Sequence, residues 1–260
     1  MTEASNVLVL SLMGALGLVM GSAVTALSFR IPRGLSWVRG RSECPSCHTP
    51  LQFLDLIPVL SFALARGRCR HCAAKIGWRY PLTELLCAAW SLLLYRHVGL
   101  VPVLPLLAIW GYLLIALLWI DLDFQLLPDA LTFPGTLLAA VVAVMTPGGV
   151  REAIFGVAIG SGALWLVAWA YFRVRKVEGM GGGDIKLAAM FGAVLGWERT
   201  LVTMFLAALM GSVWGAILLA RRSGGPQTAL PFGTLLVPAA MVTYLWGETW
   251  IRAYLGWFVR

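Results

Sequence analysis

The sequence predicts an all-α polytopic membrane protein with about eight transmembrane helices and one small cytoplasmic loop domain. Two observations support this. Of the 260 residues, 60% are hydrophobic and only 12% are charged, with a mean hydropathy of +0.83. A surface that faces water needs far more charge, so an ordinary soluble domain is excluded. In addition, apolar stretches of membrane-spanning length recur along almost the whole chain.

These apolar stretches define the expected helices, because each is long enough to cross about 30 Å of hydrocarbon. They lie near residues 6–29, 82–98, 102–120, 130–147, 152–172, 185–198, 200–220 and 231–256. The first is longer than the core of a signal peptide and follows no basic residue, so we expect it to be retained. Only Trp197-Glu198-Arg199 separates the sixth from the seventh. A count of seven spans therefore also fits the hydropathy.

Glycines four residues apart recur inside these stretches. The pairs are Gly17 and Gly21, Gly156 and Gly160, Gly192 and Gly196, and Gly211 and Gly215. Each pair lies on one helical face and allows a neighbouring backbone to approach. We expect them to pack helices within one bundle.

Residues 30–80 form the only sizeable polar region and divide the first span, residues 1–29, from a helix bundle over residues 81–260. This loop holds nine Lys and Arg residues against two acids, Glu43 and Asp55. Basic loops stay in the cytoplasm, so we expect this loop inside and, with eight spans, the N-terminus outside. The basic pair Arg221 and Arg222 falls on the same side. The net charge of +8 then indicates contact with anionic lipid of the bilayer and no nucleic-acid binding.

Four cysteines in the polar loop form two C-x-x-C pairs, Cys44 with Cys47 and Cys69 with Cys72. Two such hairpins can present four thiolates in a tetrahedron, with Zn–S distances of about 2.3 Å. A redox pair, or disulfides under an inverted topology, are the alternative interpretations, but a cytoplasmic loop is in a reducing compartment. We predict a structural zinc ion that folds the loop and, with four ligands, performs no chemistry.

Four of the twelve acids lie in two short segments at predicted membrane boundaries: Asp121, Asp123 and Asp129 in one, and Asp184 in the other. Acids are costly there and are functional candidates by default. With eight spans, the third helix runs inward and ends near Asp121, whereas the sixth runs outward and begins near Asp184. Both carboxylates then reach the same depth near the cytoplasmic face. Two acids in a poorly solvated site cannot both ionise cheaply, which suits the acid and base roles of an aspartyl protease.

Helix geometry selects the partner of Asp184. On a continuous helix, Asp121 and Asp123 point about 200° apart, so they cannot both face the bundle. Asp121 is deeper and is our choice, with Asp123 as the alternative. Asp129 follows Pro128 at a helix start, where a role as N-cap is sufficient to explain it.

The turn before Asp184 contains four glycines, Gly179, Gly181, Gly182 and Gly183. Glycine permits positive φ and close approach of a substrate backbone, so we expect this turn to open the site. A phosphate cradle is the rival interpretation, but no Lys-Ser/Thr follows at P-loop spacing. A flexible loop capped by Asp184 also fits.

The residues above resemble those of the bacterial prepilin leader peptidases, intramembrane aspartyl proteases of the G-x-G-D type. The similarity covers nearly the whole chain and rests on these segments: Gly21-Ser22 through Arg30-Ile31-Pro32, the paired cysteines, Ile57–Ser61, Arg66–Cys69, Arg79-Tyr80-Pro81, Asp121 through Asp129, Gly181–Lys186 and Leu230–Gly233. The resemblance implies that Asp121 and Asp184 are the catalytic pair. It also implies supporting residues in the same motifs, namely Gly181, Gly183, Asp123, Asp129 and Lys186. The implied substrates are type IV prepilins or type II secretion pseudopilins, and the implied location is the bacterial inner membrane, with a periplasmic N-terminus.

Many members of that family also methylate the new N-terminal amine with S-adenosylmethionine, through the cytoplasmic loop region. Gly67 matches the glycine before the third cysteine, on which methylation depends. Thr25 and Leu56 stand where the family usually has asparagine, and these departures weaken the methyltransferase half of the resemblance.

Two other function classes use the same residues. An ion- or proton-coupled transporter would use Asp121, Asp184 and Glu84 as its pathway, whereas a membrane thiol oxidoreductase would use the cysteines. Glu84 lies inside the second span, where it either lines a polar cleft or pairs with Arg79.

Overall fold

The computed structural model describes residues 3–37, 40–177, 180–220 and 231–258. Within these ranges the chain is helical, and its extended pairings are two isolated antiparallel bridges, Glu43 with Pro50 and Arg68 with Lys75. The all-α prediction is confirmed. Gly179 of the predicted glycine turn, the basic pair Arg221 and Arg222, and Leu230 lie outside the described residues.

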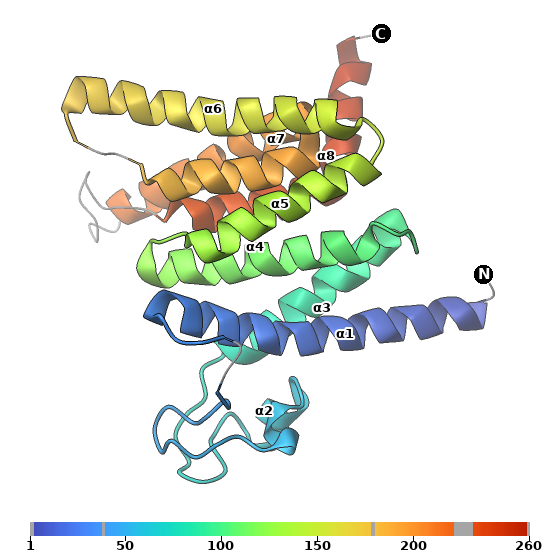
Figure 1. Cartoon of the computed structure of the whole chain (residues 1–260), viewed down its shortest axis with the longest axis vertical. Coiled ribbons are helices and arrows are strands. Elements are labelled where there is room, and N and C mark those ends of the chain that lie inside the picture. Colours follow the sequence, from blue (N-terminus) through green and yellow to red (C-terminus); the bar gives the residue numbers. More distant parts are fainter. Residues whose placement is uncertain (1–2, 38–39, 178–179, 221–230, 259–260) are drawn as a thin grey trace. The chain divides into compact units, whose positions relative to one another are not determined.

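The chain forms two compact units, residues 1–116 and 117–260. The first contains α1 (Glu3–Arg30), the short helices η1 (Ile31–Arg33), η2 (Phe53–Leu56) and α2 (Leu60–Leu64), and α3 (Arg79–Val98). The second contains α5 (Asp129–Met145), α6 (Gly149–Arg175), α7 (Gly182–Ala220) and α8 (Phe232–Phe258). Helix α4 (Leu104–Phe124) runs from one unit into the other (Figure 1).

In the first unit, α1 and α3 pack closely through the glycines of α1. A Cβ on Gly17 would lie 2.5 Å from the Cα of Ala88, and a Cβ on Gly21 would lie 2.4 Å from the Cα of Glu84. Neither position has room for a side chain. The predicted packing role of this glycine pair is confirmed.

In the second unit, α7 contacts α5, α6 and α8 and therefore forms the centre. Gly156 of α6 and Gly192 of α7 bring these two backbones together: a Cβ on Gly156 would lie 2.0 Å from the Gly192 carbonyl oxygen. Gly215 is different, because nothing among the described residues lies within 4 Å of a Cβ built there. The packing role predicted for Gly215 is therefore wrong.

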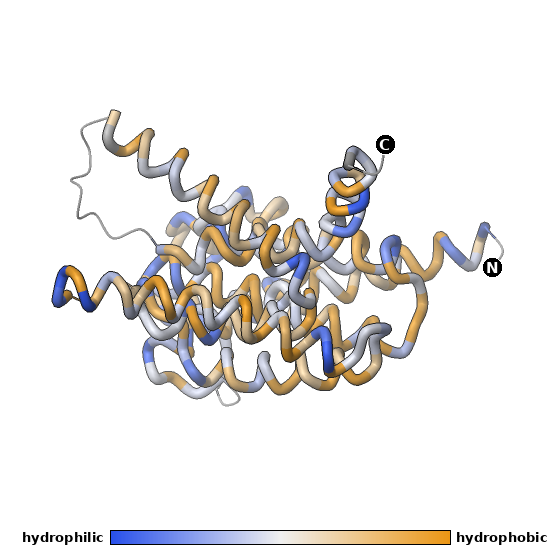
Figure 2. The backbone as a smooth tube through the Cα atoms, turned by 90° about the horizontal axis from the view of Figure 1, so that it is seen from above, coloured by the Kyte–Doolittle hydropathy of each residue, from blue (hydrophilic) through white to orange (hydrophobic). Residues whose placement is uncertain are grey.

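Among the described residues, four helices are long and apolar enough to cross a membrane, namely Glu3–Arg33, Leu104–Phe124, Gly149–Arg175 and Gly182–Leu218. Helix α5 is apolar but shorter. Figure 2 shows hydrophobic residues along the lengths of these helices. The prediction of a polytopic membrane protein agrees with this composition.

In the part of the chain that the structure describes, the eight expected spans correspond to seven long helices, because the sixth and seventh share α7. At 39 residues, a straight α7 would be about 58 Å long, roughly twice the hydrocarbon thickness. It is interrupted at Gly196, where φ is 72° and ψ is 178°. The break adjoins Trp197, the weak boundary in the sequence, and only glycine adopts such a backbone conformation readily.

The α6–α7 contact gives a test of the packing argument. Gly156→Ala should lower the stability of the protein by about 1–3 kcal/mol, because the added methyl group overpacks a backbone contact. Gly162→Ala is the matched control, since a Cβ there meets nothing within 4 Å among the described residues. Thermal unfolding in detergent measures both. Equal melting temperatures for the two variants would contradict the close packing.

Candidate active site

Asp121 lies in the last turn of α4 and is almost fully buried, with 4% of its surface exposed. Its carboxylate is held by one residue of α8. The Thr234 backbone N–H donates to Asp121 Oδ2 at 2.6 Å, and the Thr234 hydroxyl donates to the same oxygen at 2.9 Å. Two donors on one oxygen stabilise a buried carboxylate that would otherwise be costly.

The start of α8 supplies these donors for a general reason. The first amides of a helix have no partner within the helix, and the helix dipole places partial positive charge there. Gly233, in the first turn, lies against the carboxylate: a Cβ there would be 3.0 Å from Asp121 Oδ2, a tight contact. A glycine at this position therefore lets α8 approach the carboxylate without displacing it.

Asp184 lies in the first turn of α7 and is partly buried. The Gly233 backbone N–H donates to its carboxylate, and Asp121 is within electrostatic range. Consecutive residues of α8, Gly233 and Thr234, therefore each hold one of the two acids. The structure brings together the pair that the sequence argument selected.

Asp123 is exposed, whereas Asp121 is buried. This difference follows from their spacing of two residues on α4, which turns the two side chains to different faces. The predicted choice of Asp121 as the inward-facing acid agrees with the structure.

The expected N-cap role of Asp129 is wrong. Pro128 is the N-cap of α5, with extended backbone, and Asp129 is the first helical residue. The Asp129 carboxylate instead accepts a hydrogen bond from Lys186 Nζ at 2.5 Å, which links the starts of α5 and α7. The Lys186 ammonium also lies 5.2 Å from the centre of the Phe133 ring. Both charged groups of the pair are partly exposed.

The glycines before Asp184 act differently from the prediction. Gly181, Gly182 and Gly183 are not among the residues with positive φ, because α7 begins at Gly182 and imposes helical dihedral angles on the turn. Gly183 is required for space, since its Cβ would lie 2.9 Å from the Cβ of Leu127. Gly181 and Gly182 are exposed, and a Cβ on either would meet no atom closer than 3.9 Å among the described residues.

The four loop cysteines gather as the spacing predicted. The Sγ atoms of Cys44, Cys47, Cys69 and Cys72 all lie within 4.8 Å of one another, and the thiols are free. The Sγ atoms of Cys44 and Cys72 are 3.8 Å apart. A tetrahedral site with metal–sulfur bonds of about 2.3 Å has edges of about 3.8 Å, so the cluster could hold a metal ion.

Two matching hairpins build this cluster. In the first, the Cys44 N–H donates to Thr49 O and the His48 N–H donates to Cys44 O. In the second, the Cys69 N–H donates to Ala74 O and the Ala73 N–H donates to Cys69 O. The residue after each second cysteine, His48 and Ala73, has positive φ. The two C-x-x-C pairs therefore fold into the same turn.

Local hydrogen bonds also change the pKa values of the cysteine thiols. A hydrogen bond with the Thr49 hydroxyl lowers the pKa of Cys47 to about 6. Backbone donors at Cys72 and His71 lower the pKa of Cys69. The Ala74 amide acts in the same direction on Cys72, but desolvation and the neighbouring thiols together raise its pKa to about 12. All four thiols can lose their protons at this spacing only where a cation neutralises them.

The Bacterial Peptidase A24 N-terminal domain model matches residues 15–98, and the Type IV leader peptidase family model matches residues 106–216. Several similar proteins carry the name "Prepilin leader peptidase/N-methyltransferase", and three of them are compared with this chain below. That of Aeromonas salmonicida is 40% identical over 221 residues, which cover 83% of this chain and 75% of the relative.

The relative from Pseudomonas putida is 35% identical over 266 residues, covering 92% of this chain and 91% of the relative. The third, from Legionella pneumophila, is 36% identical over 223 residues, covering 84% and 77%. The chain belongs to the type IV leader peptidase family. No solved structure matches it significantly. Membership of this family favours the peptidase interpretation over the transporter and thiol oxidoreductase alternatives.

The loop position that the family resemblance connects to methylation also has a structural reason to be glycine. Gly67 has φ of 67°, and a Cβ there would lie 3.1 Å from the Phe62 ring. Of the two positions that depart from the family pattern, Thr25 is buried and its hydroxyl donates to the Gly21 carbonyl at 2.9 Å. Leu56 is exposed at the end of η2.

Two residues, Thr234 and Glu84, form hydrogen bonds that the sequence did not predict. Thr234 directly follows the Leu230–Gly233 motif. The motif indicated a functional segment but did not predict the contact of Thr234 with Asp121. Glu84 accepts a hydrogen bond from the Val59 N–H at 2.7 Å and so ties the loop to α3. Val59 has φ of 59°, an unfavourable value for a β-branched residue, so this conformation needs support from its surroundings.

Glu84→Ala should release that support. Hydrogen exchange of the Val59 amide should become about 10- to 100-fold faster, because a hydrogen bond to a charged acceptor is lost. Glu84→Gln retains an acceptor and serves as the control, with a smaller effect expected. Exchange measured by mass spectrometry on a peptide containing Val59 reports the difference. Unchanged exchange in Glu84→Ala would show that the carboxylate does not hold the segment.

Proposed function

We propose that this protein is an intramembrane aspartyl endopeptidase in which Asp121 and Asp184 are the catalytic pair. The observation that carries the proposal is the start of α8, where the Gly233 amide holds Asp184 and the Thr234 amide holds Asp121. An aspartyl protease needs two carboxyl groups at one place with different tasks.

The chemistry follows from these two groups. One carboxylate takes a proton from water as the oxygen attacks the peptide carbonyl carbon. The other, as a carboxylic acid, donates a hydrogen bond to the carbonyl oxygen and supports the tetrahedral intermediate. A proton then passes to the leaving nitrogen and the C–N bond breaks. The released leader carries the new C-terminal carboxylate, and the rest of the substrate carries the new N-terminal amine.

The proposed substrates are type IV prepilins or type II secretion pseudopilins, in keeping with the names of the relatives. A prepilin would place its apolar helix in the bilayer and leave its basic leader in the cytoplasm. The scissile bond lies between these parts, at the depth that the ends of α4 and α7 would have. Asp123 lies at the end of α4, Gly181 lies directly before α7, and the Asp129–Lys186 pair links the starts of α5 and α7. These residues would support the site.

The membrane topology belongs to the same proposal. The N-terminus would be periplasmic and the cysteine loop cytoplasmic, because nine basic residues in the loop oppose translocation. This orientation also keeps the four thiols in a reducing compartment.

We further propose that the cysteine cluster holds one structural zinc ion, with Cys44, Cys47, Cys69 and Cys72 as its ligands. The Sγ spacing supports a tetrahedral site, and four protein ligands leave no position for a reactant. When bound, the ion would neutralise the thiolates and fix the two hairpins against each other.

The methyltransferase half of the proposal rests on the family. S-adenosylmethionine would supply a methyl group to the amine that cleavage creates. Gly67 is the loop residue that the family resemblance connects to methylation. Its positive φ shapes the turn before Cys69. Thr25 and Leu56 depart from the family pattern, so methylation of the cleaved product is the direct test of this activity.

The catalytic pair of Asp121 and Asp184, called the dyad below, predicts how the cleavage rate changes in aspartate variants. Asp121→Asn and Asp184→Asn should each lower the cleavage rate by about 1,000-fold or more, and the double variant should be little worse, because the two acids act as a unit. Asp123→Asn should retain substantial activity. Asp129→Asn should be mild, since an exposed ion pair is worth only about 0–1 kcal/mol.

Single-turnover cleavage of a prepilin, read by mass spectrometry, measures these rates once folding has been checked. Normal cleavage by either Asp121→Asn or Asp184→Asn would disprove the dyad. The same spectra report methylation when S-adenosylmethionine is present, and a cleaved product without a methyl group would limit the enzyme to proteolysis.

The zinc proposal predicts about one zinc per purified chain, lost in Cys44→Ser or Cys69→Ser together with the order of the loop. Cys87→Ala is the control, because Cys87 is buried in α3 and lies outside the cluster. Elemental analysis and limited proteolysis of the loop provide the two measurements. A metal-free protein with a protease-resistant loop would rule the site out.

A further inference from the structure

The Thr234 hydroxyl forms a different hydrogen bond from those of several other threonines in the described helices. Their hydroxyl groups donate to the carbonyl of an earlier residue, as in Thr132, Thr136, Thr200 and Thr203. The Thr234 hydroxyl instead donates across the unit to Asp121, which is 113 positions earlier in the sequence. It is therefore directed at a single side chain of another helix.

Both Thr234 donors meet the same carboxylate atom. The backbone N–H and the hydroxyl reach Asp121 Oδ2 at 2.6 Å and 2.9 Å. Among the described residues, no hydrogen bond is formed with Oδ1. Because one oxygen is held by two donors, the rotation of the carboxyl group is restricted and the second oxygen is left to face a reactant.

The hydroxyl also makes the two acids of the pair unequal. Asp184 receives a backbone donor from Gly233, and Asp121 receives the equivalent backbone donor from Thr234. The side-chain hydroxyl is an additional donor on the Asp121 side. Donors that point at a carboxyl oxygen stabilise its anionic form.

We propose that Thr234 is a positioning residue that holds Asp121 as the carboxylate that takes the proton from water, with Oδ1 as the accepting atom. Asp184 is then the member of the pair that carries the proton and polarises the substrate carbonyl. This inference rests on the proposed aspartyl protease function and assigns separate tasks to its two acids. Thr234 itself does not touch the reacting atoms.

Thr234→Val tests the hydroxyl alone, because valine has nearly the same shape and keeps the backbone N–H. We expect kcat for prepilin cleavage to fall about 10- to 100-fold, the effect of losing one hydrogen bond to a charged group. KM should stay unchanged, since Thr234 contacts the acid and not the substrate. Thr234→Ser restores the donor and should bring kcat back to within about threefold of the original protein.

The same helix offers a matched control. Thr243 is fully buried in α8, and its hydroxyl has no hydrogen-bond partner within the described part of the chain. Thr243→Val therefore makes the same chemical change without removing a bond, and both stability and kcat should be retained.

Three outcomes would overturn the inference. If the Thr234→Val variant has the same kcat as the Thr243→Val variant, the Thr234 hydroxyl does not position Asp121. If the Thr234→Ser variant is as impaired as the Thr234→Val variant, the loss of kcat comes from altered packing. If Thr234→Val and Thr234→Ala both fail to fold while Thr234→Ser folds, the hydroxyl has a structural role instead. The proposed function fails separately, through normal cleavage by Asp121→Asn.

Discussion

The arrangement of the second unit depends on one constraint, the burial of the Asp121 carboxylate in a helix bundle with little charge. A buried anion is tolerated only where donors meet it. The first turn of α8 provides them, because its amides have no partner within the helix. Gly233 and Thr234 serve Asp184 and Asp121, respectively. The polar site and the start of α8 therefore require each other: the helix end needs acceptors, and the acids need donors.

Close packing at glycines is the second feature on which this site depends. Gly156 and Gly192 bring α6 and α7 into backbone contact, Gly183 admits Leu127, and Gly233 lets α8 approach Asp121. At Gly196 the reason is different, since α7 needs a backbone conformation that other residues adopt only with strain. Close approach in a lipid environment compensates for the missing hydrophobic driving force between helices. A chain with so many glycines in its helices therefore gains the tight packing that a polar site inside a bundle requires.

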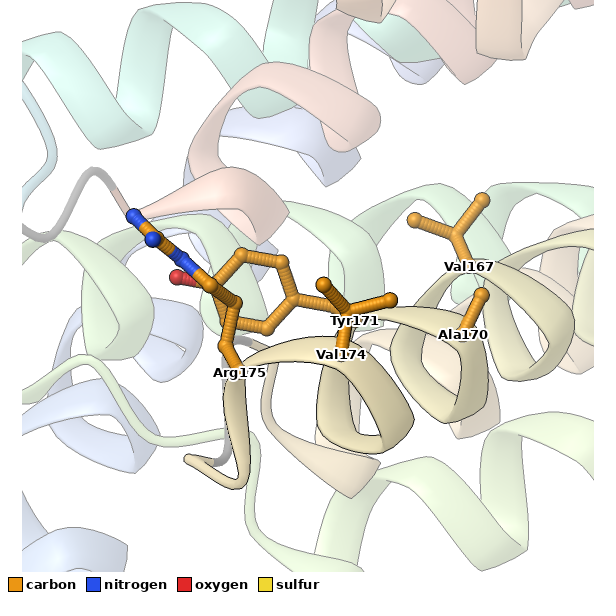
Figure 3. Close-up of a pocket in the computed structure, with 5 residues that line it drawn as sticks. All are labelled: Val167, Ala170, Tyr171, Val174 and Arg175. Atoms are coloured by element: carbon orange, nitrogen blue, oxygen red, sulfur yellow. The ribbon is translucent and has the colours of Figure 1, made fainter.

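Many apolar side chains on the described helices are exposed, as expected of surfaces that contact lipid. One example is the shallow groove near the end of α6, lined by Val167, Ala170, Tyr171, Val174 and Arg175 (Figure 3). All five side chains come from α6, and the lining of the groove is apolar apart from Arg175. Lipid chains with anionic headgroups suit such a surface, because the basic residue lies at the helix end where headgroups would be.

The sequence by itself determined the membrane class, the positions of the long helices, the two cysteine hairpins and the acids at helix ends. These properties follow from hydropathy, spacing and the cost of charge in lipid, which are local. It did not reveal that α7 contains two expected spans, that Asp129 pairs with Lys186, that Glu84 holds Val59, or that Thr234 holds Asp121. Those contacts join residues between 25 and 113 positions apart, and no periodicity in the chain encodes them. Only the packing of helices decided which donor each buried acid meets, because the hydrogen bond requires both groups to arrive at the same point in space.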